Sequence, residues 1–115
     1  MQIEIQAVDF ALTEGLRAHL QYRLNFALWR FQDRIARVAV RLSDVNGPRG
    51  GVDKVCRLRV RLHGMPDVVI EDTEADLYMA ISRAADRAGR TMGRQMERVR
   101  GEFDTSKEMQ HDRTE

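Results

Sequence analysis

The sequence has little or none of several features that define common classes of protein. Cys56 is the only cysteine, so no disulfide can form within the chain. It stands among apolar residues in a strand-like run, and free cysteines of this kind are usually buried and inert. No apolar run approaches the roughly 20 residues that cross a bilayer, and the first residues lack the basic start and apolar stretch of a secretory signal. We therefore expect a cytoplasmic protein that does not associate with membranes.

The sequence also lacks the groupings of residues from which catalytic and cofactor sites are built. His19, His63 and His111 have no recognisable Ser, Cys or carboxylate partner in a motif. Three scattered histidines and one thiol do not have the spacing of metal ligands. The glycine-rich stretch 47–51 lacks the Lys-Ser/Thr ending of a phosphate-binding P-loop. We therefore expect a protein that is not an enzyme and that uses no metal, cofactor or small-molecule substrate.

Lysine is scarce, because Lys54 and Lys107 are the only two, whereas arginine occurs 17 times. The formal net charge is only +1, but the charge is unevenly distributed. Residues 17–63 carry ten Arg and one Lys against three acids, residues 83–100 carry six Arg against two acids, and residues 66–76 carry five acids and no base. A planar guanidinium can bond two phosphate oxygens at once. The basic segments therefore suit an anionic partner.

The hydrophobic pattern predicts one folded domain with strands and helices. A chain of 115 residues, 43% apolar and 32% charged, has room for a single core. Apolar and polar residues alternate with the period of a strand at 2–7, 35–43 and 55–63, and a short fourth strand is expected at 68–70. The stretch 46–51 is dense in turn formers and predicts a hairpin loop.

Two further segments have the periodicity of amphipathic helices. The first is about five turns long, with Thr13 or Asp9 as its cap, and its apolar stripe is Leu16, Leu20, Leu24, Ala27, Leu28 and Phe31. The second begins at a capping box of Thr73 and Asp76, and its apolar stripe is Leu77, Ile81, Ala84, Ala85, Ala88, Met92 and Val99. Gly89 and Gly93 lie inside it and each costs about 1 kcal/mol relative to alanine, so local loosening is expected.

The order β-α-β-β-β-α predicts an α+β fold. Strands joined by a helix should be parallel through a right-handed crossover, and strands joined by hairpins should be antiparallel. The result is a four-stranded mixed sheet with both helices on one face. We place this domain at residues 1–102 and expect a disordered, polar and acidic tail at 103–115.

Five arginines fall on one side of the second predicted helix. At about 100° per residue they lie within an arc of roughly 80° that contains no acid and lies away from the apolar stripe: Arg83, Arg87, Arg90, Arg94 and Arg98. Like charges one turn apart repel by a few tenths of a kcal/mol, so an anionic partner that relieves this repulsion is the economical explanation. We call these five arginines the column; it is about 22 Å long. It predicts an RNA-facing stripe, and a merely solvated face is the alternative.

Other arginines form two less specific groups. Those of the first helix either contact RNA or shield the margin of the core: Arg17, Arg23, Arg30 and Arg34. Those of the strands should project from the sheet face opposite the helices: Arg37, Arg41, Arg57, Arg59 and Arg61. That face lacks the aromatic residues that stack bases on RNA-binding sheets of the RRM type. We therefore interpret it as a phosphate contact or a plain solvated surface.

Tyr22, Phe26 and Trp29 recur along the first helix, away from its leucine stripe. They either pack against a neighbouring helix or loop, or form an exposed patch for a protein partner or weak self-association. The second interpretation supports an alternative function, in which the protein is an interaction module that does not bind RNA.

The start of the second helix, Asp76-Leu77-Tyr78-Met79-Ala80-Ile81, resembles the D-[ML]-Y-x-A-I signature of the ribosome hibernation promoting factor and ribosome-associated inhibitor family. Residues 1–3, 12–17 and 31–35 are also similar to that family, so the resemblance covers residues 1 to about 101 in order. The family's short form is the one that the chain resembles.

This resemblance implies the same β-α-β-β-β-α topology and a function. It implies binding in the decoding channel of the small ribosomal subunit, over the sites of messenger and transfer RNA, and silencing of translation in stress or stationary phase. The implied partner is the small subunit with its ribosomal RNA. Basic positions of the family fall on residues of both helices: Arg17, Arg23, Arg87, Arg90, Arg94 and Arg98.

Overall fold

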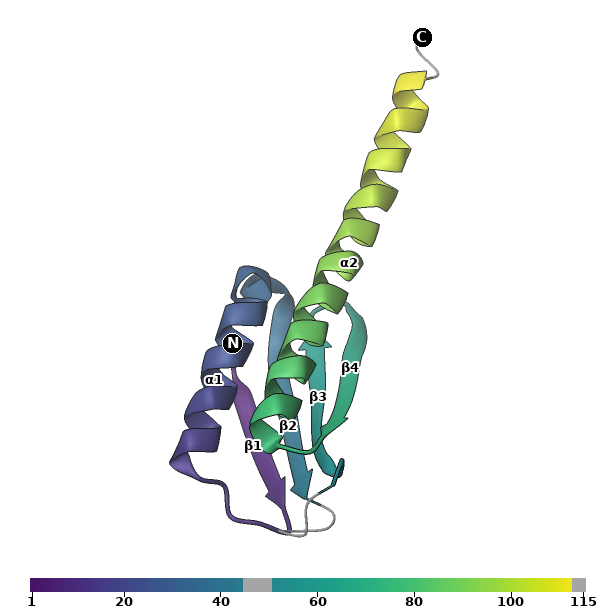
Figure 1. Cartoon of the computed structure of the whole chain (residues 1–115). Helices are drawn as coiled ribbons and strands as arrows, with labels where there is room; N and C mark the ends of the chain where they lie inside the picture. Colours follow the sequence, from purple (N-terminus) through teal and green to yellow (C-terminus); the bar gives the residue numbers. More distant parts are fainter. Residues whose placement is uncertain (45–50, 113–115) are drawn as a thin grey trace.

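The computed structural model describes residues 1–44 and 51–112, with side chains described as far as residue 101. The elements in chain order are β1 (Ile3–Val8), α1 (Glu14–Leu28), the 3₁₀ helix η1 (Trp29–Arg34), β2 (Ile35–Asp44), β3 (Lys54–Leu62), β4 (Met65–Glu74) and α2 (Leu77–Asp112). In Figure 1 the two helices lie side by side over the sheet, and α2 extends past it. The predicted order of elements is confirmed.

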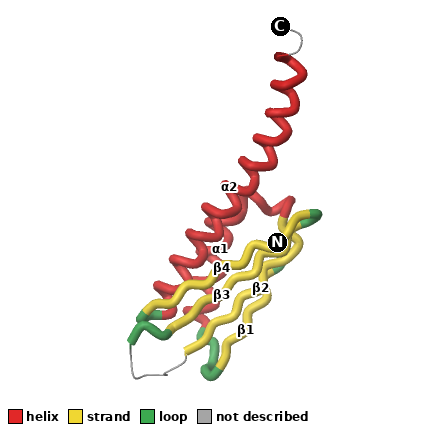
Figure 2. Tube along the Cα trace, turned by 90° about the vertical axis from the view of Figure 1, so that its right-hand side faces the viewer, coloured by secondary structure: helices red, strands yellow, loops and turns green. Residues whose placement is uncertain are grey.

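The four strands form one sheet in the order β1-β2-β3-β4. β1 pairs with β2 in parallel, with Ile3 opposite Val38, and the pairs β2–β3 and β3–β4 are antiparallel. Figure 2 shows both helices on one face of the sheet and the other face uncovered. The predicted α+β fold, a mixed sheet with both helices on one face, is therefore correct.

The core lies between the sheet and the helices and is built from the inward-facing residues of each element. α1 contributes its leucines at four-residue spacing, and the central strands contribute every second residue. The largest fully buried side chains are Leu20, Leu24, Leu28, Leu42, Leu58, Ile81 and Met92. Each such side chain contributes about 1.5–3 kcal/mol by leaving water. The core fixes the positions of both helices relative to the sheet.

Cys56 is fully buried within this core, as its place in an alternating strand predicts. Burial disfavours the thiolate and, with a smaller effect of the Asp72 charge, raises the pKa of the Cys56 thiol to about 12. The thiol therefore stays protonated at neutral pH and is a poor nucleophile.

The fourth strand is longer than its apolar pattern predicts. β4 covers ten residues and pairs with β3 along nearly its whole length, from Leu62 opposite Met65 to Lys54 opposite Glu74. The turn needs only His63 and Gly64, because Gly64 adopts a φ of +70°. Pro66 lies within β4 and is tolerated there because that strand forms an edge of the sheet.

The two helix starts differ from each other in how well the sequence predicts them. Thr13 caps α1, since its Oγ1 accepts a hydrogen bond from the backbone N–H of Leu16 at 3.1 Å. The capping box of Thr73 and Asp76 is wrong, because Thr73 pairs opposite Val55 within the sheet. Asp76 alone caps α2, accepting at Oδ1 from the backbone N–H of Tyr78 at 3.1 Å.

The predicted apolar stripes are correct except near their ends. α1 ends at Leu28 and tightens into η1, so the first helix is shorter than five turns of regular α-helix. In α2, the predicted core residue Val99 is 38% exposed, and Met96 is the last side chain that packs partly against the core. α2 itself continues past the sheet (Figure 1).

Gly89 has a packing role in α2. A Cβ built on Gly89 would lie 3.1 Å from the backbone oxygen of Ala27 and 3.3 Å from its Cβ. The absence of a side chain therefore lets α1 and α2 approach closely at this level. α2 continues through Gly89 and Gly93 as one helix, and local loosening at these glycines stays a prediction.

The predicted hairpin loop and the predicted C-terminal tail are only partly covered by the described residues. The turn-rich stretch 46–51 lies outside the described residues except for Gly51. The assigned α2 continues to Asp112 without a break at residue 102, and the division into a domain 1–102 and a tail 103–115 stays a prediction. Among the described residues, no helix has the length and apolar character needed to cross a membrane.

Candidate nucleic-acid interface

α2 carries its five column arginines on the surface, and all five are exposed. They face away from the buried stripe of Ile81, Ala85, Ala88 and Met92. The geometry of the column therefore matches the prediction from helical periodicity. The charges around the column differ from those expected from α2 alone, because acids of β4 lie beside two of its arginines.

The first two arginines of the column are paired with acids from β4. Arg83 Nε lies 2.9 Å from Glu74 Oε1, and Arg87 lies 3.5 Å from Asp72 Oδ2. Arg87 also donates a hydrogen bond of 2.6 Å to the backbone oxygen of Glu71. Because the acid-rich strand packs beside α2, it neutralises the beginning of the column.

The last three arginines of the column have no carboxylate partner among the described residues. Arg94 donates to Thr91 Oγ1 at 3.3 Å, and neither Arg90 nor Arg98 forms an ion pair within that part of the chain. We call Arg90, Arg94 and Arg98 the distal arginine face. The unneutralised charge of α2 is concentrated there.

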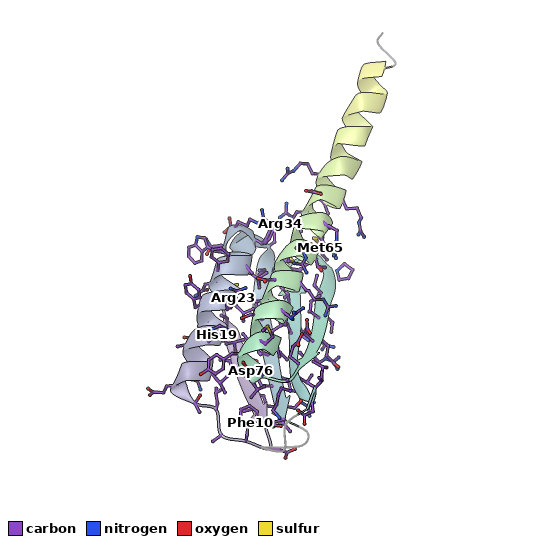
Figure 3. The ribbon with its side chains drawn as sticks, in the orientation of Figure 1. Phe10, His19, Arg23, Arg34, Met65 and Asp76 are labelled. Atoms are coloured by element: carbon purple, nitrogen blue, oxygen red, sulfur yellow. The ribbon has the colours of Figure 1, made fainter. Side chains whose placement is uncertain are left out.

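Arg23, predicted to contact RNA, joins the two helices. Its guanidinium pairs with Asp86 at 2.5 Å, and its Nε is buried and has no hydrogen-bond partner among the described residues. Figure 3 places Arg23 between α1 and α2. Its guanidinium is thus engaged within the protein, and RNA contact by Arg23 stays a prediction.

The other predicted arginines of the first helical segment are exposed: Arg17, Arg30 and Arg34. The Arg30 guanidinium lies over the ring of Phe31, 4.5 Å from its centroid. Arg34 lies where η1 meets α2 (Figure 3). None of these arginines has a carboxylate partner in the portions of the chain that the structure describes. Arg30 and Arg34 therefore add to the positive charge at the same end of the molecule as the distal arginine face.

The conspicuous hexapeptide at the start of α2 acts in packing. Besides the cap formed by Asp76, the ring of Tyr78 contacts that of His19, with centroids 5.1 Å apart. A Cβ on Gly15 would lie 2.7 Å from the Tyr78 hydroxyl, so glycine leaves room for it. His19 Nε2 also lies 2.9 Å from Ser82 Oγ. These contacts hold the beginnings of α1 and α2 together and so align the two helices.

The basic residues of the open sheet face are largely paired. The pairs are Arg37 with Glu4 at 3.0 Å, Arg57 with Glu71 at 3.9 Å, and Arg59 and Arg61 with Asp67 at 3.8 and 3.9 Å. Such exposed pairs contribute little to stability, but they reduce the positive charge that the face presents. This arrangement favours the solvated-surface interpretation of that face.

A cluster of charged side chains lies where β2 ends and β3 begins, at the end of these strands that is far from η1. Lys54 Nζ lies 2.8 Å from Asp44 and 2.9 Å from Asp53. Its hydrogen bonds to Asp44 and then Asp53 raise the pKa of Lys54 above its ordinary value. The group is an internal ion cluster, and no set of three His, Cys, Asp or Glu side chains within the described residues is placed to hold a metal ion.

The aromatic side chains that recur away from the leucine stripe, Tyr22 and Phe26 of α1 and Trp29 of η1, are exposed. The exposed fractions are 66% for Tyr22, 75% for Phe26 and 59% for Trp29. The rings of Tyr22 and Phe26 lie nearly parallel, at 21°, with centroids 6.5 Å apart. The interpretation in which these residues pack against a neighbouring element is therefore wrong, because the core side of α1 is filled by its leucines.

Comparisons with known proteins agree with this architecture. Residues 3–100 match the family described as Sigma 54 modulation protein / S30EA ribosomal protein. The crystal structure of the Protein Y N-terminal domain of Thermus thermophilus is similar, with a TM-score of 0.67 and 29% identity over 82% of this chain and 98% of that chain. A ribosomal subunit interface protein from Coxiella burnetii has a TM-score of 0.70 over 84% of this chain and 99% of that one, but its 15% identity shows a shared fold alone. A search of curated protein sequences finds no match.

Proposed function

The chain belongs to the Sigma 54 modulation protein / S30EA ribosomal protein family, and from this premise we propose that it binds the small ribosomal subunit through ribosomal RNA. The distal arginine face is the centre of the proposed contact. Binding modulates the ribosome, and the protein catalyses no reaction. The family membership supports a ribosomal partner.

The observation that carries the proposal is that Arg90, Arg94 and Arg98 are exposed and that none of them forms an ion pair within the described residues. Three exposed guanidinium groups on successive helical turns repel one another. Phosphate oxygens remove this repulsion and accept two hydrogen bonds from each guanidinium. Arg17, Arg30 and Arg34 extend the contact, while Arg83, Arg87 and Arg23 must exchange an internal partner before they contact RNA.

The finer parts of the proposal follow from the family resemblance. The protein occupies the decoding channel in the cytoplasm, over the sites of messenger and transfer RNA, and silences ribosomes under stress or in stationary phase. A helix that projects past the sheet (Figure 1) suits insertion into a channel walled by RNA. The polar residues 103–115 form a tail beyond the binding domain 1–102.

The affinity for small subunits should fall steeply with salt, because every phosphate that is neutralised releases counterions. With three phosphate contacts, the slope of log K against log [salt] is about −2 to −2.7, which is roughly a 20- to 40-fold loss between 50 and 200 mM salt. Co-sedimentation of the wild-type protein with purified small subunits over that range measures the slope. A slope near zero would contradict a phosphate-based contact.

The exposed aromatic face favours a second candidate function, an interaction or self-association module that acts through Tyr22, Phe26 and Trp29. This alternative expects self-association that is insensitive to salt and is weakened by Trp29→Ala. The RNA-binding proposal expects Trp29→Ala to pellet with small subunits like the wild type. The same sedimentation experiment therefore separates the two.

A further inference from the structure

An open cleft lies between η1 and the outer part of α2. Its volume is about 710 Å³, within the roughly 300–1,000 Å³ of small-ligand sites. Three arginines line it, Arg30, Arg34 and Arg100, together with one acid, Asp33. The rest of its lining is apolar: Phe31, Met96 and Val99. We call it the η1–α2 cleft.

The arginines of the cleft are positioned and available. The Arg30 guanidinium rests on the Phe31 ring at 4.5 Å, and it lies 3.3 Å from the point where a Cβ on Gly93 would stand. Glycine at position 93 thus leaves this space to the guanidinium. Arg34 and Arg100 are exposed. None of the three forms an ion pair within the described residues, even though Asp33 lines the same cleft.

The apolar lining is partly accessible at this place. Phe31 is 8% exposed and Val99 is 38% exposed, while Met96 is half-buried against the core. Val99 breaks the pattern of α2, because its neighbours on the solvent side are charged. An apolar strip beside guanidinium groups matches a ligand that has a flat, weakly polar ring system and an anionic group.

The charge of the cleft matches one phosphate group. Three arginines and one aspartate give a formal charge of +2, from three minus one. Each phosphodiester of RNA carries one negative charge, and the phosphate monoester of a free nucleotide carries about −1.5 to −2 charges at pH 7, so the positive cleft attracts both. Arginine recognises such a group with two parallel hydrogen bonds, and nucleobases stack on aromatic rings and guanidinium planes.

We propose that the η1–α2 cleft binds one nucleotide unit, with its phosphate held by Arg34 and Arg100 and its base against Val99 and Met96. The cleft adjoins the half of α2 that carries Arg94 and Arg98, so the nucleotide belongs to an unpaired segment of RNA bound there. In this respect the inference rests on the proposed function. The cleft adds recognition of an unstacked nucleotide to a contact that is otherwise made with phosphates.

Calorimetric titration with adenosine 5′-monophosphate, inorganic phosphate and adenosine tests the cleft. The nucleotide should bind at least about 10-fold more tightly than phosphate or adenosine, because only the nucleotide fills both halves of the cleft. Arg34→Glu and Arg100→Glu should each weaken nucleotide binding by at least about 10-fold. Arg41→Glu, the same charge change at an exposed arginine of the open sheet face, outside the cleft, should leave it unchanged. Equal binding of phosphate and nucleotide, or no response to Arg34→Glu and Arg100→Glu, overturns the inference.

A second titration identifies the source of the nucleotide. A short single-stranded RNA is compared with the same RNA carrying abasic units. The wild-type protein should bind the abasic RNA more weakly than the intact RNA. Arg100→Glu should bind the two RNAs with equal affinity. If the nucleotide binds but the abasic RNA binds as well as the intact one, RNA is overturned as the source. If no nucleotide binds while the protein still pellets with small subunits, the cleft inference fails and the proposed function stands.

Discussion

Reversing the distal arginine face, by combining Arg90→Glu, Arg94→Glu and Arg98→Glu, is expected to weaken binding to small ribosomal subunits by at least about 100-fold. A loss of about 1 kcal/mol for each charged hydrogen-bond donor corresponds to a factor of about 100 for three, and the new carboxylates add repulsion. All three side chains are exposed, so the fold should be retained. Co-sedimentation over a range of subunit concentrations gives the two affinities.

The matched control is the other half of the same column, with Arg83→Gln and Arg87→Gln combined. These guanidinium groups already have partners in Glu74 and Asp72, so their contribution to RNA binding should be smaller, with a loss of less than about 10-fold. If this variant binds as weakly as the triple reversal, the division of the column by the acids of β4 is wrong.

Gly89→Leu is expected to destabilise the fold by about 1–3 kcal/mol, the usual cost of overpacking a close contact. The reason is the 3.1 Å approach between a Cβ at this position and the backbone oxygen of Ala27, which cannot move independently of α1. The midpoint of urea unfolding, followed by circular dichroism, measures the change in the free energy of unfolding when the slope of that free energy against urea concentration is the same for both proteins.

Gly101→Leu is the control for this substitution within the same helix. A Cβ on Gly101 has no atom within 4 Å, and leucine has a higher helix propensity than glycine. Gly101→Leu should therefore leave stability unchanged or slightly higher. Equal destabilisation by both substitutions would mean that leucine is unfavourable for another reason than the contact between the helices.

The fold was largely predictable because most of its elements have strong local signals. The leucines at positions 16, 20, 24 and 28 and the alternation in β3 specify one buried face each, and chain order then leaves few topologies. The extent of β4 was not predictable, since Met65 and Glu74 join the sheet through pairing with β3 and not through their own apolar pattern. Because the same pairing places Thr73 within the sheet, Asp76 and not Thr73 caps α2.

The candidate site was predictable as a helical face but not in its electrostatics. Helical periodicity predicts that the arginines lie on one side of α2. It takes into account only the acids of the same helix. The acids that neutralise Arg83 and Arg87 come from β4, and Arg23 finds Asp86 across the helix pair. The η1–α2 cleft brings together residues more than 60 positions apart in the chain, which no local pattern contains. The acidic segment 66–76 directly before the column was the available signal.

In the proposed complex the helical layer, and α2 above all, faces ribosomal RNA. Directed hydroxyl-radical probing from a single tethered iron tests this orientation, because buried Cys56, with a pKa of about 12, leaves an introduced cysteine as the reactive thiol. Glu97→Cys places the tether on α2 beside the distal arginine face, and Val69→Cys places it on the open sheet face, where Val69 is 45% exposed.

In complexes with small subunits, the tether at position 97 should cleave ribosomal RNA around the decoding channel, and the tether at position 69 should give much weaker cleavage there. Strong cleavage from position 69 with none from position 97 would contradict this orientation, because the sheet and not α2 would then face the RNA.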